Sequence, residues 1–129
     1  MLKSACRSLY NKKEMIKDGD GLEVEAIKSA EEFNTVTGGE APVIVKFYAD
    51  WCPDCKVMDM FIGDVIKDYP QYKWYEINSD EFRAIADENQ VMGIPSLLVF
   101  QNGEKKAHLH SANAKSPEEV REFLNHVVL

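Results

Sequence analysis

The segment FYADWCPDCK, residues 47–56, decides the fold and chemistry of this 129-residue chain. It joins a dense apolar run, residues 43–49, to a segment with apolar residues at three- and four-residue spacing. The first pattern predicts a buried central strand, and the second predicts a helix with one buried stripe. A C-x-x-C pair, Cys52 and Cys55, therefore stands where a strand passes into a helix.

The position of Cys52 predicts a reactive sulfur. Cys52 lies at the helix N-terminus, with Pro53 in the first turn, where a missing N–H leaves no hydrogen bond unmade. The unpaired amides and the positive end of the helix dipole stabilise an anion there. We expect the pKa of the Cys52 thiol to lie below the roughly 8.5 of free cysteine, which makes Cys52 the nucleophile. Cys55, one turn further in and less exposed, is expected to resolve the mixed disulfide by attacking Cys52.

A zinc site is the metal-binding alternative for the same cysteines. Structural zinc takes four ligands, normally from a second C-x-x-C or from paired histidines. His108 and His110 share a face of a predicted strand and could complete such a set, whereas Cys6 stands apart. The strand-to-helix context favours a redox pair, so no metal or organic cofactor is expected.

Elements of two kinds alternate around the cysteines. Alternating apolar and charged residues predict a strand over 22–27, and Ser29 opens a capped helix that ends at Gly38-Gly39. Asn102-Gly103 predicts a tight hairpin, and Ser116-Pro117 starts the last helix. Further strands are predicted over 74–77, 96–100 and 105–110, with a helix over 81–88. This order predicts an α/β fold with a mixed sheet covered by helices on both faces.

Length and charge bound the remaining possibilities. The chain suits one domain, which we assign to residues 22–129, preceded by an extension over 1–21 that forms an arm or a short helix. The extension carries +2 of the net −7, which leaves −9 for the domain. Such acidity argues against nonspecific binding to nucleic acid or anionic membranes, and no run is apolar enough to span a bilayer. We expect a cytoplasmic monomer, with mitochondrial targeting by residues 1–21 as the alternative.

Three motifs in sequence order resemble the thioredoxin family: the segment 47–56, then Gly93-Ile-Pro-Ser96, then Gln101-Asn-Gly-Glu104. The resemblance covers about residues 22–129 and implies the thioredoxin fold. It also implies a cis bond between Ile94 and Pro95, a minority state for such bonds. Pro95 would pack against the disulfide, and the Ile94 backbone would pair with an incoming substrate.

The resemblance also implies the activity and its partners. It implies a thiol–disulfide oxidoreductase that reduces disulfides of proteins or small molecules and is regenerated by a thioredoxin reductase or a similar dithiol donor. A binding module with little turnover is the alternative from another class. The expected substrate-binding residues are Trp51, Pro53, Asp54, Ile94 and Pro95.

Three departures from the family pattern stand out. Asp54 places a carboxylate near the thiolate, which opposes the dipole and favours a reductant, unless the charge is simply solvated. Lys46 and Glu76 stand where the family carries a buried Asp and its Lys partner on the next strand, so the signs are exchanged. We expect a buried Lys46–Glu76 pair, with Glu76 as candidate proton acceptor for Cys55; a purely structural pair is the alternative.

The third departure lies after the last strand. The glycine that the family places in the docking surface is absent, and His110, Ser111 and Ala112 occupy the region. We expect these bulkier residues to narrow or redirect the access of substrates.

Overall fold

A five-stranded mixed sheet forms the centre of the computed structural model, which describes residues 24–129. The strand order is β1-β3-β2-β4-β5. β1, β2 and β3 run parallel, whereas β4 is antiparallel to β2 and β5. The strands are β1 (Val24–Ala26), β2 (Val43–Tyr48), β3 (Lys73–Asn78), β4 (Ser96–Gln101) and β5 (Glu104–Leu109).

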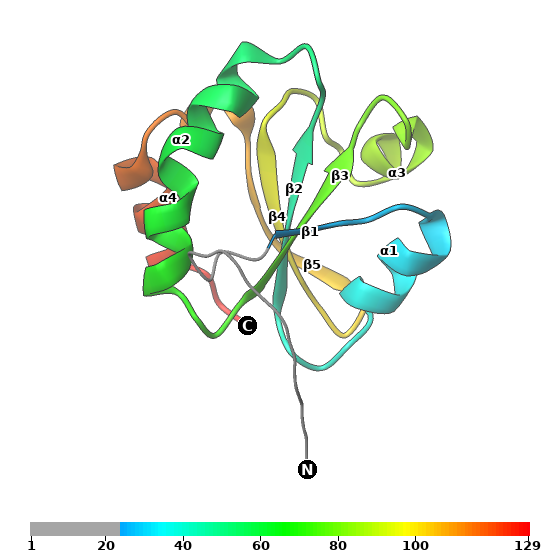
Figure 1. Ribbon diagram of the computed structural model, residues 1–129. Helices are drawn as coiled ribbons and strands as arrows, with labels where there is room; N and C mark the ends of the chain where they lie inside the picture. The colour runs from blue at the N-terminus through cyan, green and yellow to red at the C-terminus, as the bar shows by residue number, and fades with distance from the viewer. Residues whose placement is uncertain (1–23) are drawn as a thin grey trace, which may run out of the picture.

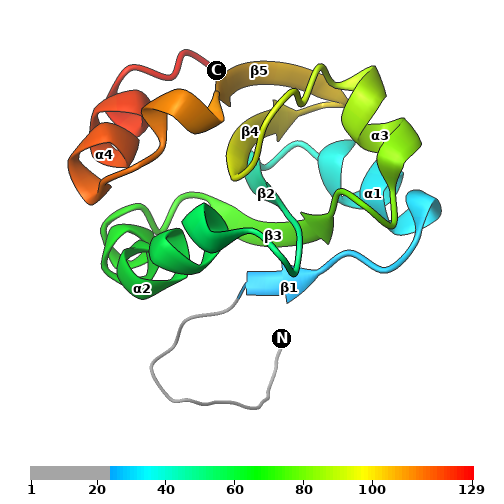
Figure 2. The ribbon, with the colours of Figure 1, turned by 90° about the horizontal axis from the view of Figure 1, so that it is seen from above.

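Helices cover both faces of the sheet, as Figures 1 and 2 show from two directions. α2 and α4 lie on one face, and α1 and α3 lie on the other. The helices are α1 (Ala30–Thr37), α2 (Pro53–Asp68), α3 (Arg83–Glu88) and α4 (Pro117–Asn125), with a 3-10 turn, η1 (Ser111–Asn113), before α4. The predicted fold class, a mixed sheet with helices on both faces, is confirmed.

The central strands supply both halves of the core because successive side chains point to opposite faces. On β2, Ile44 packs with the buried residues of α2 and α4, whereas Val45 and Phe47 pack with those of α1 and α3. β4 divides its side chains in the same way. Strands buried on both faces need the dense apolar run that the sequence shows over residues 43–49.

Local capping and turn chemistry set the element ends. The Ser29 hydroxyl accepts a hydrogen bond from the amide of Glu32 at 3.0 Å, and the Ser116 hydroxyl accepts one from Glu119 at 3.3 Å. Asn102 and Gly103 adopt φ of 56° and 80°, the left-handed pair that a two-residue hairpin requires. These three predictions are confirmed.

Several boundaries differ from those predicted by one or two residues, and two of these differences lie next to the site. The helix predicted from residue 81 begins at Arg83, because the Asn78 side chain accepts hydrogen bonds from the amides of Asp80 (2.8 Å) and Glu81 (3.2 Å) and forms a turn there. The last strand ends at Leu109, and His110 caps η1. The proposed boundary at residues 21 and 22, the extension and Cys6 lie outside the described residues.

Candidate active site

Cys52 and Cys55 form a disulfide at the N-terminus of α2. Cys52 is the N-cap residue, and its Sγ accepts a hydrogen bond from the Cys55 amide at 3.1 Å. Pro53 occupies the first turn, as predicted. An amide aimed at Sγ is the arrangement that stabilises a thiolate once the disulfide is reduced.

Both cysteines are buried in this oxidised form. Each residue is only 2% exposed, so the expected difference in exposure between Cys52 and Cys55 is wrong for the disulfide state. The exposed side chain at this place is Trp51, at 67%. Tyr48 and Ile94 pack against the small cluster that Ala49 makes with the two cysteines.

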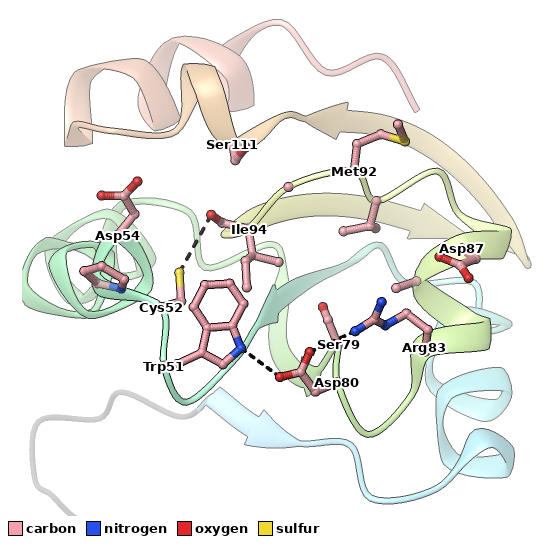
Figure 3. Close-up of a pocket in the computed structure, with 14 residues that line it drawn as sticks. Trp51, Cys52, Asp54, Ser79, Asp80, Arg83, Asp87, Met92, Ile94 and Ser111 are labelled. Atoms are coloured by element: carbon pink, nitrogen blue, oxygen red, sulfur yellow. Dashed lines mark hydrogen bonds and ion pairs between the residues drawn. The ribbon is translucent and has the colours of Figure 1, made fainter.

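The loop before β4 meets the disulfide from the other side. The Ile94–Pro95 bond is cis, as the resemblance implied, and Pro95 is fully buried. The Ile94 carbonyl oxygen lies 3.7 Å from Cys52 Sγ (Figure 3). The Ser96 hydroxyl donates a hydrogen bond to the Gly93 carbonyl at 2.7 Å, which closes the loop upon itself.

A groove of about 510 Å³ runs past Cys52 between α2, α3 and the loop before β4 (Figure 3). Four of the five expected substrate-binding residues line it: Trp51, Pro53, Asp54 and Ile94. The expected residues that do not line the groove are Pro95, Cys55, Lys46 and Glu76. Of the two cysteines, only Cys52 therefore lines the groove that a substrate would enter.

One wall of this groove consists of residues that the sequence analysis did not single out. The Trp51 indole N–H donates to a carboxylate oxygen of Asp80 at 2.8 Å, and the other oxygen of Asp80 pairs with Arg83 at 3.3 Å. β2 and β3 are parallel neighbours, so residues that follow their carboxyl ends meet at one edge of the sheet. That rule was the signal available for Asp80, which follows β3 as Trp51 follows β2.

Asp54 forms an ion pair that was not predicted from the sequence. Lys115, just before α4, reaches the Asp54 carboxylate at 3.1 Å. Both side chains are more than half exposed, so the pair is worth well under 1 kcal/mol to stability. It nevertheless places a compensating positive charge beside the acidic residue of the C-x-x-C segment.

The direct Lys46–Glu76 pair predicted from the sequence is not formed. The two residues are aligned across β2 and β3, but the Lys46 ammonium bonds to the carboxylate of Asp59 on α2. Lys46 is buried at 5% side-chain exposure, whereas Asp59 keeps 60%. Glu76 is half-buried, and burial raises the pKa of its carboxyl, with Lys46 opposing the rise and Asp59 adding to it. Because Asp59 stays largely in solvent, its pair with Lys46 desolvates one of the two bonded charges, whereas a Lys46–Glu76 pair would desolvate both in part.

His108 and His110 stack on one another with ring centroids 3.9 Å apart. Burial, together with the nearby His110 and Lys105, lowers the pKa of His108 to about 4. Within residues 24–129, no three His, Cys, Asp or Glu side chains are grouped to hold a metal ion. The zinc alternative has no support from this part of the chain.

Comparison with known proteins agrees with the geometry. The thioredoxin family model matches residues 24–126. This chain belongs to the thioredoxin family. Its disulfide at the N-terminus of α2 and this membership make it a thiol–disulfide oxidoreductase that acts on disulfide substrates.

Three relatives show how far the similarity extends. Thioredoxin-1 of Saccharomyces cerevisiae is 37% identical over 90 residues, which cover 70% of this chain and 87% of the relative. A chloroplastic M-type thioredoxin of Pisum sativum is 32% identical, covering 79% of this chain and 61% of the relative. The solved thioredoxin of Malassezia sympodialis superposes with a TM-score of 0.69 at 28% identity, covering 81% of this chain and 90% of that one.

None of the helices in residues 24–129 has the length and apolar character needed to cross a bilayer.

Proposed function

We propose that this protein is a disulfide reductase in which Cys52 attacks the substrate and Cys55 releases it. The Cys52 thiolate attacks one sulfur of a substrate disulfide, and the other sulfur leaves as a thiolate that takes up a proton. Cys55 then loses its proton and attacks Cys52, which frees the second substrate thiol and closes the protein disulfide. Two electrons pass from the protein dithiol to the substrate.

The single observation that supports this assignment is the setting of Cys52. Its sulfur caps α2, accepts the Cys55 amide at 3.1 Å and lies 3.7 Å from the Ile94 carbonyl at the groove floor. Cys55 lies one turn inside the helix and away from the groove lining. An incoming disulfide thus reacts first with Cys52. Cys55 then reacts only with the mixed disulfide that Cys52 has formed.

Glu76 is the proposed proton acceptor for Cys55, with Lys46 as its modulating neighbour. Burial raises the pKa of the Glu76 carboxyl, which brings it toward the range in which a carboxylate takes up a proton. Lys46 acts on Glu76 through space, since its own bond is to Asp59. An unchanged pH profile of disulfide exchange in Glu76→Gln would contradict this role.

We also propose the regenerating partner, the location and the oligomeric state. A thioredoxin reductase or a similar dithiol donor is the proposed partner that regenerates the protein. The proposed location is the cytoplasm, and the proposed oligomeric state is a monomer. Mitochondrial targeting by residues 1–21, the alternative, falls outside the described residues. A binding module with little turnover remains the competing function.

Insulin reduction driven by dithiothreitol separates turnover from binding. In a Cys6→Ser background, the protein should accelerate insulin precipitation, Cys52→Ser should abolish the acceleration, and Cys55→Ser should accumulate a mixed disulfide with insulin. A redox titration gives the reduction potential of the Cys52–Cys55 pair. A potential near −270 mV would indicate a reductant, and one near −120 mV would indicate an oxidase. Equal rates with and without Cys52 would leave only the binding module.

A further inference from the structure

The wall of the groove opposite Trp51 is built by the segment between β5 and α4. Ser111, the first residue of η1, lines the groove together with Cys52, Gly93 and Ile94. In Figure 3 its side chain projects from this segment toward the loop that carries Ile94. Ala112, its neighbour in η1, is exposed and lies outside the groove lining.

Ser111 is packed tightly against the loop before β4. A Cβ placed on Gly93 would lie 3.4 Å from the Ser111 Cβ and closer still to the Ser111 hydroxyl. Glycine at 93 is thus the residue that leaves room for the Ser111 side chain. The Gly93 carbonyl is itself held by the Ser96 hydroxyl, so the surface that Ser111 meets has little freedom to retreat.

The segment that carries Ser111 is also held at its other end. Ala114 is buried at 3% exposure within the core that α2 and α4 share. Lys115 pairs with Asp54, the residue between the two cysteines. Residues 111–115 therefore contact both the loop before β4 and the first turn of α2, the two segments that border Cys52, and these contacts set the place of Ser111 on the groove wall.

We propose that Ser111 is a specificity-determining residue, which restricts the groove to extended disulfide segments with small side chains next to the cysteine. This inference rests on the proposed disulfide exchange at Cys52. A bulky flanking side chain would have to displace either Ser111 or the closed Gly93–Ser96 loop before the substrate sulfur reaches Cys52. A small flanking residue passes without that displacement.

A single-turnover experiment tests the proposal. Reduced protein in the Cys6→Ser background is mixed with symmetric disulfide dimers of short peptides, whose cysteine is flanked by Gly or by Phe, and the released peptide thiol is quantified by chromatography. We expect roughly three- to tenfold faster release from the Gly-flanked dimer. Ser111→Gly should make the two release rates equal by accelerating release from the Phe-flanked dimer alone. Ser111→Ala should reduce the difference between the two rates in part.

Ala112→Gly is the matched control, since it introduces the same flexibility in η1 without changing the groove lining. It should keep the wild-type ratio. A ratio that Ser111→Gly leaves unchanged, or rates for both dimers that change by the same factor, would overturn the steric role while exchange at Cys52 stands. Absence of thiol release from both dimers by the wild type would overturn the proposed function as well. Thermal unfolding of each variant verifies that it is folded.

Discussion

The ammonium of Lys46 on β2 bonds to the carboxylate of Asp59 on α2, one helical turn beyond Cys55. This bond crosses from the sheet to the helix that carries both cysteines. It places the buried positive charge of Lys46 beneath the active-site end of α2. Glu76, the register neighbour of Lys46 on β3, completes a cluster of three charges there.

Asp59→Asn should destabilise the fold, because it leaves the ammonium of the buried Lys46 without its carboxylate. We expect the free energy of unfolding in urea to fall by about 1–2 kcal/mol, less than for a fully buried pair because Asp59 is solvated and Glu76 is near. Asp64→Asn, which neutralises an exposed carboxylate of the same helix, should stay within about 0.5 kcal/mol of wild type. Equal losses in the two variants would show that the Lys46–Asp59 bond contributes nothing specific.

Glu76→Gln should make the fold more stable at neutral and alkaline pH. The folded pKa of Glu76 is raised by burial, so the folded state holds a proton that the unfolded state has already released. Wild-type stability therefore declines as pH rises through the window from the ordinary value of 4.5 to the raised one. Urea unfolding at pH 4 and pH 8 should give the variant a higher free energy of unfolding than wild type only at pH 8. The same difference in free energy of unfolding between variant and wild type at both pH values would contradict a raised pKa for Glu76.

His108→Gln should make stability less sensitive to acid. The pKa of His108 is lowered to about 4, first by burial and then by His110 and Lys105, so the unfolded state binds a proton that the folded state excludes. Stability is therefore lost as pH falls from about 6.5 toward 4. Since His108 is partly exposed, solvent screening limits the loss to about 1 kcal/mol.

The comparison for His108 is the exposed His126 of the same chain. Free energies of unfolding at pH 7 and pH 4.5 should differ less in His108→Gln than in wild type, and His126→Gln should follow wild type. A His108 variant with an undiminished acid loss would show that the acid sensitivity arises elsewhere.

Lys115→Gln should slow the alkylation of Cys52 in reduced protein. The Lys115 ammonium lies 3.1 Å from Asp54 and offsets a carboxylate that would otherwise disfavour the neighbouring thiolate. We expect the midpoint of the alkylation rate against pH to rise by a few tenths of a unit, and Asp54→Asn to lower it by a similar amount. In the double variant, Lys115→Gln should add almost nothing, and independent additive shifts would exclude coupling through Asp54.

Asp80→Ala should weaken substrate binding without slowing chemistry. It removes the hydrogen bond that orients the exposed Trp51 ring and releases Arg83 at the groove wall. Loss of one such bond corresponds to about a two- to fivefold rise in KM for insulin, with kcat unchanged. Glu81→Ala, at the adjacent exposed position, serves as the control. A fall in kcat alone would assign Asp80 to the chemical step instead.

The sequence predicted the helices, strands and turns of the fold better than it predicted which side chains pair within the site. The caps at Ser29 and Ser116 and the hairpin at Asn102-Gly103 are set by neighbours within four residues, and all three formed as predicted. The Lys46–Glu76 pair was wrong although its register was right, because alignment across two strands does not determine which carboxylate a long flexible side chain reaches.

Residue order alone was enough to predict a helix capped by Cys52 and a mixed sheet between two helical layers, whereas the cis bond before Pro95 was implied by the resemblance to the thioredoxin family. Periodicity, capping and turn chemistry are short-range effects, and they are legible in a chain without its coordinates. The tertiary structure decided that Trp51 meets Asp80, that Lys115 meets Asp54 and that Ser111 faces Gly93. These contacts join residues 18 to 61 positions apart in the sequence, and each side chain selects among several neighbours by distance and hydration, which only the packed molecule defines.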